Sequence, residues 1–204
     1  TPTGSGDCSS WGTACGLQDA LGIATSNDEI WIAEGLYTPG SSEGDSFTIT
    51  GDQDGLKIYG GFESGDSFAD RNPSDHPVVL SGDIGGDDVT NTNGVTLDDA
   101  DINGQNSDHV LIFNGGASVS ADITSATVIN GVTITGGYAD GFFPDDRGGG
   151  LFCDGAGSGN RCSPTLSRII FAGNSASNGG ALLNRGPNGG ESNPRILNTV
   201  FIGN

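Results

Sequence analysis

The sequence has no methionine and few basic residues. Seven lysines and arginines stand against 26 aspartates and glutamates in 204 residues, and the formal net charge is −19. A nucleic-acid-binding protein needs a basic face to displace counterions from phosphates, and this composition does not supply one. The same shortage argues against attraction to anionic lipid, and no run approaches the roughly 18 apolar residues that cross a bilayer. We therefore expect neither nucleic acid nor membrane as a partner of this segment.

Apolar residues are also scarce, at 33% of the sequence, whereas glycine occupies 37 of the 204 positions. This glycine content is well above the usual ~7%, but the Gly-X-Y period of collagen is missing. Short runs rich in Val, Ile and Phe recur along the whole chain and argue against wholesale disorder. The composition therefore indicates an elongated solenoid of short strands around a thin core.

Only one segment, 16–25, spaces its apolar residues as a helix does, at Leu17, Ala20, Leu21 and Ala24. Elsewhere the apolar residues alternate or form short runs. These runs predict strands at 29–34, 46–50, 56–59, 78–81, 110–114, 128–135, 150–153, 167–172, 181–184 and 196–202. Turn-forming residues separate them, and many strands without intervening helices predict an all-β protein.

The C-terminal third contains an internal repeat. Gly149-Gly150 recurs as Gly179-Gly180, and Gly173-Asn174 recurs as Gly203-Asn204, each at a spacing of 30. Residues 149–174 therefore align on 179–204 without a gap, and 130–137 is a divergent earlier copy. A fixed period of about 20–50 residues marks a solenoid, and three short strands per period make one coil of a parallel β-helix. Stacked coils should place Leu166 on Ile196, Phe171 on Phe201 and Asn174 on Asn204.

The four cysteines form two local pairs, Cys8 with Cys15 and Cys153 with Cys162. Neither pair has the spacing of a zinc site, so we predict two disulfides, with free buried thiols as the alternative. Disulfides imply an oxidising compartment, and the acidic composition fits an exported protein.

The two ends of the chain carry different expectations. Residues 1–28, with the helix and the first disulfide, should form an N-terminal cap in which Trp11 packs over the first coil. Residues 29–204 should form the β-helix. The chain begins at Thr1, which suggests a processed or shortened protein. It stops in the middle of a repeat, so we expect either that the coils continue or that another molecule stacks on this end.

Several segments in order resemble the N-terminal part of large bacterial extracellular right-handed parallel β-helix proteins. They are 11–14, 17–21, 28–39, 56–62, 71–73 and 79–84. Phe171-Ala-Gly-Asn174 and Phe201-Ile-Gly-Asn204 match the FxxN pattern of polymorphic outer-membrane protein repeats. Gly179-Gly-Ala-Leu182 is similar to their GGAI pattern, with Leu in place of Ile. The resemblance implies a right-handed β-helix that is secreted or displayed at a bacterial cell surface. Members of this group include adhesins, autotransporter passenger domains, anchored surface proteins and some carbohydrate-active proteins, so the fold leaves function open.

A catalytic site of the kinds found on parallel β-helices is not evident. A pectate-lyase-like site needs an Arg or Lys base beside calcium-binding carboxylates, and a polygalacturonase-like site needs Gly-His-Gly and Arg-x-Lys. His76 and His109 lack those neighbours, and no Arg-x-Lys occurs. We assign no catalytic residue and favour a non-enzymatic protein.

Acidic residues concentrate between positions 83 and 108. The segment from Asp99 to Gln105 follows the first half of an EF-hand calcium loop, but position 12 is Val110 rather than a bidentate glutamate. We predict a Ca²⁺ loop without EF-hand helices, and a solvated acidic loop is the alternative. The candidate ligands are Asp99, Asp101, Asn103 and Gln105, with Asp83 and Asp87 as weaker candidates.

Phe142 and Phe143 lie in a loop rich in Gly and Asp and are candidates for contact with a ligand or partner. Alternatively, the two rings fold back over the coil. The expected function is that of an extracellular adhesin or structural module. Its partner would be a second copy, stacked end to end into a fibre or sheath, or a host or cell-surface glycan or protein. The alternative is a β-helix protein that binds or cleaves polysaccharide.

Overall fold

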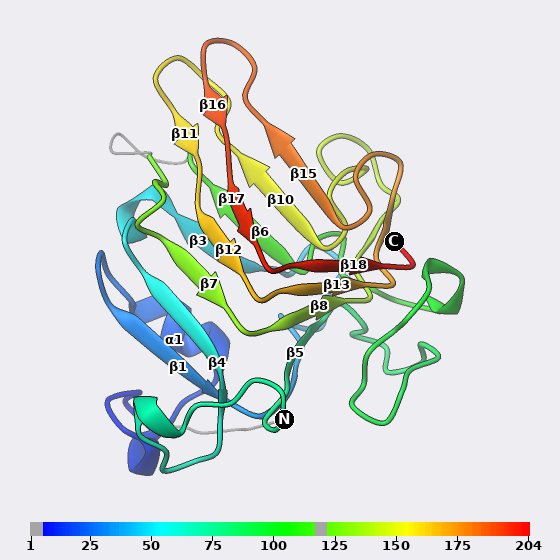
Figure 1. The fold of residues 1–204 in the computed structure, drawn as a ribbon. Coiled ribbons are helices and arrows are strands. Elements are labelled where there is room, and N and C mark those ends of the chain that lie inside the picture. The colour runs from blue at the N-terminus through cyan, green and yellow to red at the C-terminus, as the bar shows by residue number, and fades with distance from the viewer. Residues whose placement is uncertain (1–5, 117–121) are drawn as a thin grey trace.

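The computed structural model describes residues 6–116 and 122–204, and most of its secondary structure is short strands in parallel sheets (Figure 1). The first sheet contains β1 (Glu29–Ala33), β4 (Lys57–Phe62), β7 (Val128–Asn130), β12 (Thr165–Ser167) and β17 (Arg195–Leu197). The second contains β2 (Gly35–Tyr37), β5 (Val78–Ser81), β8 (Thr133–Thr135), β13 (Ile170–Ala172) and β18 (Val200–Ile202). The third contains β3 (Phe47–Thr50), β6 (Leu111–Asn114), β10 (Leu151–Asp154) and β15 (Leu182–Arg185).

Two further pairs extend the corners of the molecule. They are β9 (Tyr138–Ala139) with β14 (Ser175–Ala176), and β11 (Arg161–Cys162) with β16 (Glu191–Ser192). The chain visits the first, second and third sheets in that order and then returns to the first, and we call one such passage a circuit. Every pairing between these strands is parallel. The all-β prediction is therefore confirmed, and the parallel sheets are consistent with a β-helix-like architecture.

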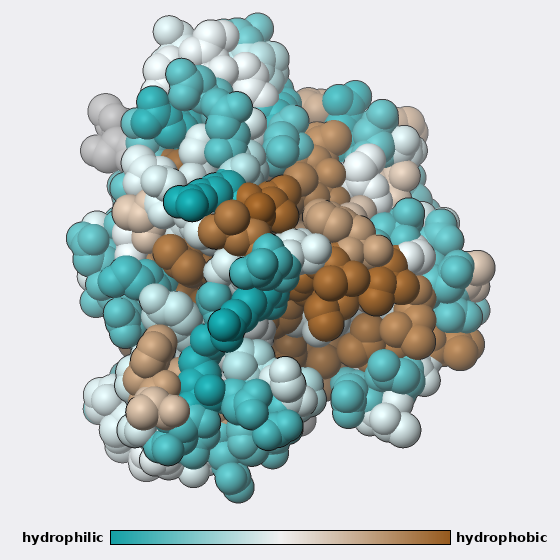
Figure 2. Space-filling model, in the orientation of Figure 1, coloured by the Kyte–Doolittle hydropathy of each residue, from teal (hydrophilic) through white to brown (hydrophobic). Residues whose placement is uncertain are grey.

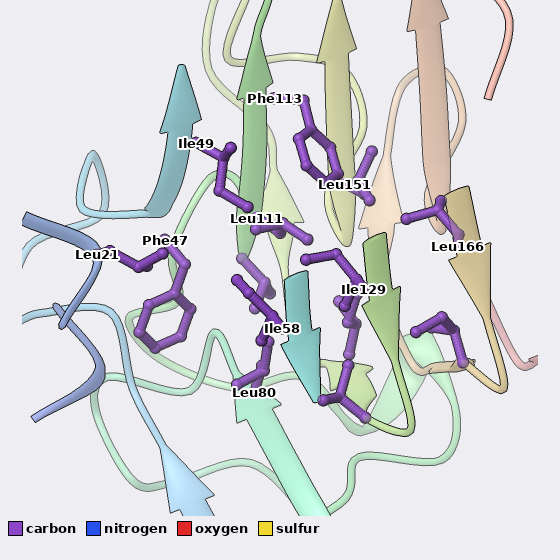
Figure 3. Close-up of a cluster of buried hydrophobic side chains, with 14 of the residues drawn as sticks. Leu21, Phe47, Ile49, Ile58, Leu80, Leu111, Phe113, Ile129, Leu151 and Leu166 are labelled. Atoms are coloured by element: carbon purple, nitrogen blue, oxygen red, sulfur yellow. The ribbon is translucent and has the colours of Figure 1, made fainter. Parts of the chain in front are cut away.

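The three sheets enclose one apolar core (Figure 3). Phe47 and Ile49 of β3, Ile58 of β4 and Leu166 of β12 are nearly or fully buried in it. Residues at equivalent positions of successive circuits lie directly beside one another, as Ile58 does beside Ile129 of β7. Because the core is thin, a sequence in which only 33% of the residues are apolar is enough to fill it.

The predicted repeat is confirmed in most of its positions. Phe171 pairs with Phe201, and their rings stack at 5.1 Å with an interplanar angle of 6°. Leu166 pairs with Ile196. Nδ2 of Asn174 donates to Oδ1 of Asn204 at 2.7 Å, which is the expected asparagine ladder.

The gap-free alignment of 149–174 on 179–204 is wrong in the third sheet. There Leu151 pairs with Leu182, at a spacing of 31, and the pairing holds through Asp154 and Arg185. By Arg161 and Glu191 the spacing has returned to 30. The loop between these strands is thus one residue shorter in the last circuit, because a turn at the surface absorbs a length change more easily than a paired strand does.

Three predicted strands, 128–135, 167–172 and 196–202, are each two strands separated by a sharp corner. The corner residues Gly131, Arg168 and Asn198 have φ of 78°, 54° and 49°. This left-handed conformation ends a strand. Two of the three residues are not glycine, so the corners were not recognisable from glycine positions. The short strands β2, β9, β11, β14 and β16 were also not predicted as separate elements.

The N-terminal segment carries the one α-helix of the described residues, α1 (Leu17–Ile23), which contacts β3. Its buried residues are Leu17, Ala20 and Leu21, as the spacing predicted. The short 3₁₀ helices are η1 (Trp11–Thr13), η2 (Gly51–Gln53), η3 (Phe68–Asp70) and η4 (Asp99–Asp101). None of the described helices is long and apolar enough to cross a membrane.

Both predicted disulfides, Cys8–Cys15 and Cys153–Cys162, are formed. Trp11 lies against Phe62, with ring centroids 5.9 Å apart, and its Nε1 donates to the Asp66 carbonyl at 2.8 Å. The prediction placed Trp11 over the first coil, whereas the ring that it contacts, Phe62 of β4, belongs to the second circuit.

Candidate functional site

The last circuit presents an apolar surface to solvent. Leu166 and Phe171 are fully buried, whereas their counterparts one circuit later, Ile196 and Phe201, are 38% and 50% exposed. We define the end face as the apolar residues of β15, β17 and β18 at this end: Leu182, Ile196, Leu197, Val200, Phe201 and Ile202. Figure 2 shows a continuous hydrophobic area over β18 and its neighbourhood. Exposed apolar patches of this kind mark interaction surfaces.

The end face also presents open strand edges. β17 and β18 are the outermost strands of the first and second sheets, and β15 is outermost in the third. Each has a row of backbone N–H and C=O groups with which no described strand pairs. Open edges next to apolar side chains favour pairing with a further strand.

The segment between β5 and β6, which we call the acidic insertion, is held together by its own hydrogen bonds. The Asp83 carboxylate accepts backbone N–H groups from Gly86 at 2.6 Å, Asp87 at 3.1 Å and Asp88 at 3.3 Å. The Asp88 carboxylate accepts the backbone N–H of Asn103 at 2.7 Å. These hydrogen bonds fix the path of the loop.

Asp83, Asp87 and Asp88 are the described carboxylates that come close enough together to hold a metal ion, with ligand atoms within 4.8 Å of one another. Burial raises the pKa of Asp88, and the nearby charge of Asp83 adds to that rise although several hydrogen bonds oppose it. The weaker sequence candidates Asp83 and Asp87 are thus brought together. Asp88, which the sequence did not indicate as a ligand, completes the group.

The stronger sequence candidates lie elsewhere in the same insertion. Asp99 and Asp101 form η4 and do not belong to that carboxylate group. Nδ2 of Asn103 donates to the Asp101 carbonyl at 2.9 Å, and Gln105 is exposed. The Ca²⁺ loop at these four positions remains a prediction.

The two candidate contact residues behave differently. Phe142 is 94% exposed, whereas the guanidinium groups of Arg147 and Arg185 lie 4.9 and 5.1 Å from the centre of the Phe143 ring. Arg185 is itself held by Asp154, at 2.8 Å. Phe143 is therefore fixed on the surface by two cations, and Phe142 projects from the same loop.

Beside this loop lies a pair of titratable groups with perturbed pKa values, Asp108 and His109, which the sequence did not indicate as a pair. Burial raises the pKa of Asp108 to about 6, and the charges of Asp145, Glu43 and Asp140 add to the rise. Burial lowers the pKa of the neighbouring His109, whose ring stacks on Phe152 at 5.3 Å. The signal that could have found them was the run of acidic residues around Asp145.

His109 itself lies 3.2 Å from the Gly148 carbonyl through Nδ1 and 3.7 Å from Asp145 through Nε2. It is 4% exposed. A neutral imidazole in this position links the Gly148 turn to the segment that leads into β6.

No protein-family model, no curated protein and no solved structure matches this chain.

Proposed function

We propose that the chain is a non-enzymatic structural or adhesive module of an extracellular bacterial protein, built as a right-handed parallel β-helix and related to the proteins that it resembles. Three parallel sheets visited in a constant order support the fold. The two disulfides support export. A stiff stack of short strands suits a spacer or display role, because each circuit is braced by its neighbours.

The observation that carries the proposal is the end face. Within the molecule, each inward-facing residue is buried by the circuit that follows, as Phe171 is by Phe201. Covering Phe201, which is half exposed, would contribute about 1 kcal/mol, and Ile196 and Leu182 would add to it. We propose that the end face is covered, either by further circuits of a longer chain or, in the 204-residue chain, by a second copy.

The opposite end supports a particular geometry for this contact. There α1 buries Leu17 and Leu21 against the core and covers β3. The end face of one copy therefore cannot lie flat on the core at the other end of the next copy. Contact between two end faces is self-complementary and closes as a dimer, so a fibre or sheath would need a second contact.

The test is the dependence of molar mass on concentration, measured by size-exclusion chromatography with light scattering. The wild-type chain should shift from monomer to dimer as concentration rises, and Phe201→Asp should remain monomeric because it places a charge in the contact. Val89→Asp is the matched control, since Val89 is 60% exposed on the insertion between β5 and β6. A wild-type chain that stays monomeric at millimolar concentration would refute the dimer.

The adhesive version of the proposal has its own observation, the 94% exposure of Phe142. A projecting aromatic ring next to Phe143, which two arginines contact, suits binding to a host or cell-surface glycan or protein. A glycan array and a cell-binding assay with Phe142→Ala, compared with Val89→Ala, test it. Release of an ultraviolet-absorbing product from polyuronates would instead favour the polysaccharide-cleaving alternative.

We also propose that Ca²⁺ binds in the acidic insertion, through the group of Asp83, Asp87 and Asp88 or through the predicted loop. Asp87 is exposed and available, and a divalent cation would relieve the repulsion among the three carboxylates. Binding there would tighten the insertion against the strands.

A further inference from the structure

A groove runs along the outer edge of β1, at the opposite end of the molecule from the end face. Its volume is about 780 Å³. Every residue from Asp28 to Ala33 lines it, together with Leu17, Ala20 and Ile23 of α1 and the disulfide of Cys8 and Cys15. Strand β1 thus forms one side of the groove, and α1 and the segment closed by the Cys8–Cys15 disulfide form the other walls.

The strand edge in this groove is open. β1 is the terminal strand of the first sheet, and β4 pairs with only one of its edges. The Asp28 carbonyl accepts the Lys57 N–H at 2.9 Å, so alternate residues from Asp28 onward face β4. The backbone groups of Glu29 and Trp31 therefore point into the groove.

One contact shows where the open edge ends. The Tyr37 hydroxyl, which also lines the groove, donates to the Ala33 carbonyl at 2.8 Å. This side chain takes the position that the next N–H of an added strand would occupy. The open stretch of β1 therefore suits a short extended segment rather than a long strand.

The walls specify the chemistry of the occupant. Ile23 of α1 is 62% exposed, and Ile30 is half-buried at the edge of the core, so the groove offers apolar contacts. The described residues that line it include the acidic Asp28, Glu29 and Asp66 but no lysine or arginine. Hydrogen bonds from Thr25 lower the pKa of Asp28, which keeps its carboxylate charged. Lys57, outside the groove, lies 3.4 Å from Glu29 on the exposed surface, where such a pair contributes little.

We propose that this groove binds an extended segment of another protein, basic and partly apolar, which adds to β1 as a further strand. Main-chain hydrogen bonds to Glu29 and Trp31 would hold the segment, its apolar side chains would contact Ile23 and Ile30, and its basic side chains would lie near the carboxylates. A whole circuit of a second copy does not suit this groove, because residues of α1 and of the segment closed by the Cys8–Cys15 disulfide line it beside β1. The proposal is independent of the end face.

The test is a fluorescence-anisotropy titration of the 204-residue chain with a labelled eight-residue peptide of alternating lysine and valine. Two control peptides separate the contributions: one replaces lysine by glutamate, and one carries N-methyl groups on alternate residues, which remove the N–H donors of one edge. Saturable binding of the first peptide and at least about tenfold weaker binding of both controls are expected for strand addition. If the N-methylated peptide binds as tightly as the first peptide, main-chain hydrogen bonds do not contribute and the proposal is overturned. Absence of binding by the first peptide would also overturn it.

Matched variants locate the site. Ile23→Arg should weaken binding by about tenfold or more, because it adds bulk and positive charge to the groove wall, whereas Val89→Arg should bind like wild type. Phe201→Asp should also bind like wild type, which separates this site from the end face. Equal affinities of the Ile23 and Val89 variants would overturn the proposal. So would binding that appears only after residues 1–5 are removed, or a wild-type dimer that Ile23→Arg dissociates.

Discussion

The asparagine ladder offers the sharpest test of how the circuits are held together. Asn174 is fully buried at the corner after β13. Its Oδ1 accepts the Gly137 N–H at 3.1 Å, and its Nδ2 lies 3.0 Å from the Ile134 carbonyl, 3.1 Å from the Ala172 carbonyl and 2.7 Å from Oδ1 of Asn204. One side chain therefore ties three successive circuits together.

Replacing Asn174 by alanine should cost about 3 kcal/mol of unfolding free energy. The buried Gly137 N–H would lose its acceptor, which costs about 1–3 kcal/mol, and each lost donor contact with a buried carbonyl adds about 1 kcal/mol. Asn204 supplies the matched control, because it occupies the equivalent corner of the last circuit and is exposed. Its bonds to the Phe171 and Ile202 carbonyls, at 3.0 and 2.8 Å, can be replaced by water. Asn204→Ala also removes the Oδ1 that accepts Nδ2 of Asn174 at 2.7 Å and the Asn174 N–H at 3.2 Å, but Nδ2 keeps its two carbonyl partners and water can reach both groups at this end of the molecule. Asn204→Ala should therefore cost about 1 kcal/mol, clearly less than Asn174→Ala.

Urea unfolding followed by far-ultraviolet circular dichroism measures both variants. The midpoint of Asn174→Ala should fall clearly below that of Asn204→Ala at a similar slope. If the two variants lose the same free energy, or if Asn174→Ala loses less than about 1 kcal/mol, then the buried hydrogen bonds do not brace the corner and the reasoning fails.

Three other perturbations address the titrating group, the cation and the second disulfide. The pKa of Asp108 is raised to about 6 in the folded protein, so wild-type stability is highest with this carboxyl protonated and falls as pH rises from about 4 through 6. Asp108→Asn should therefore raise the melting temperature at pH 7 and change it little at pH 4; an equal gain at both values would contradict this. Adding Ca²⁺ after EDTA should raise the melting temperature of wild type and of Asp19→Asn but not of Asp87→Asn, and a wild-type melt indifferent to Ca²⁺ counts against the site. Replacing Cys153 and Cys162 by serine should cost about 2.6 kcal/mol by loop entropy, measured by urea unfolding, and no loss would show that packing alone orders this loop.

The sequence predicted the structure well at positions where a single physical requirement restricts the residue type. Phe171 and Phe201 were found because an inward position must be apolar in every circuit, and Asn174 and Asn204 because a buried corner must be hydrogen-bonded. Local cysteine spacing likewise predicted the disulfides. Such features repeat with the circuit and need no knowledge of neighbouring elements.

Features set by tertiary contacts could not be read in the same way. Arg168 adopts a left-handed conformation because the chain turns there between two sheets, and arginine is not a residue type that predicts such a turn. Asp88 joins Asp83 and Asp87 only because the insertion folds back on itself. The groove beside β1 depends on where α1 docks, so no motif in either segment encodes it.

The unequal lengths of the circuits have a consequence for the order in which the molecule folds. In the first sheet Arg195 pairs with Thr165, 30 positions earlier, whereas Val128 pairs with Lys57, 71 positions earlier. Closing the longer loop costs about 0.8 kcal/mol more in chain entropy, and contacts between distant residues form late. The pairing of β4 with β7 is thus expected to form late in folding. We therefore expect the circuits from β7 onward to pair with one another before β7 pairs with β4.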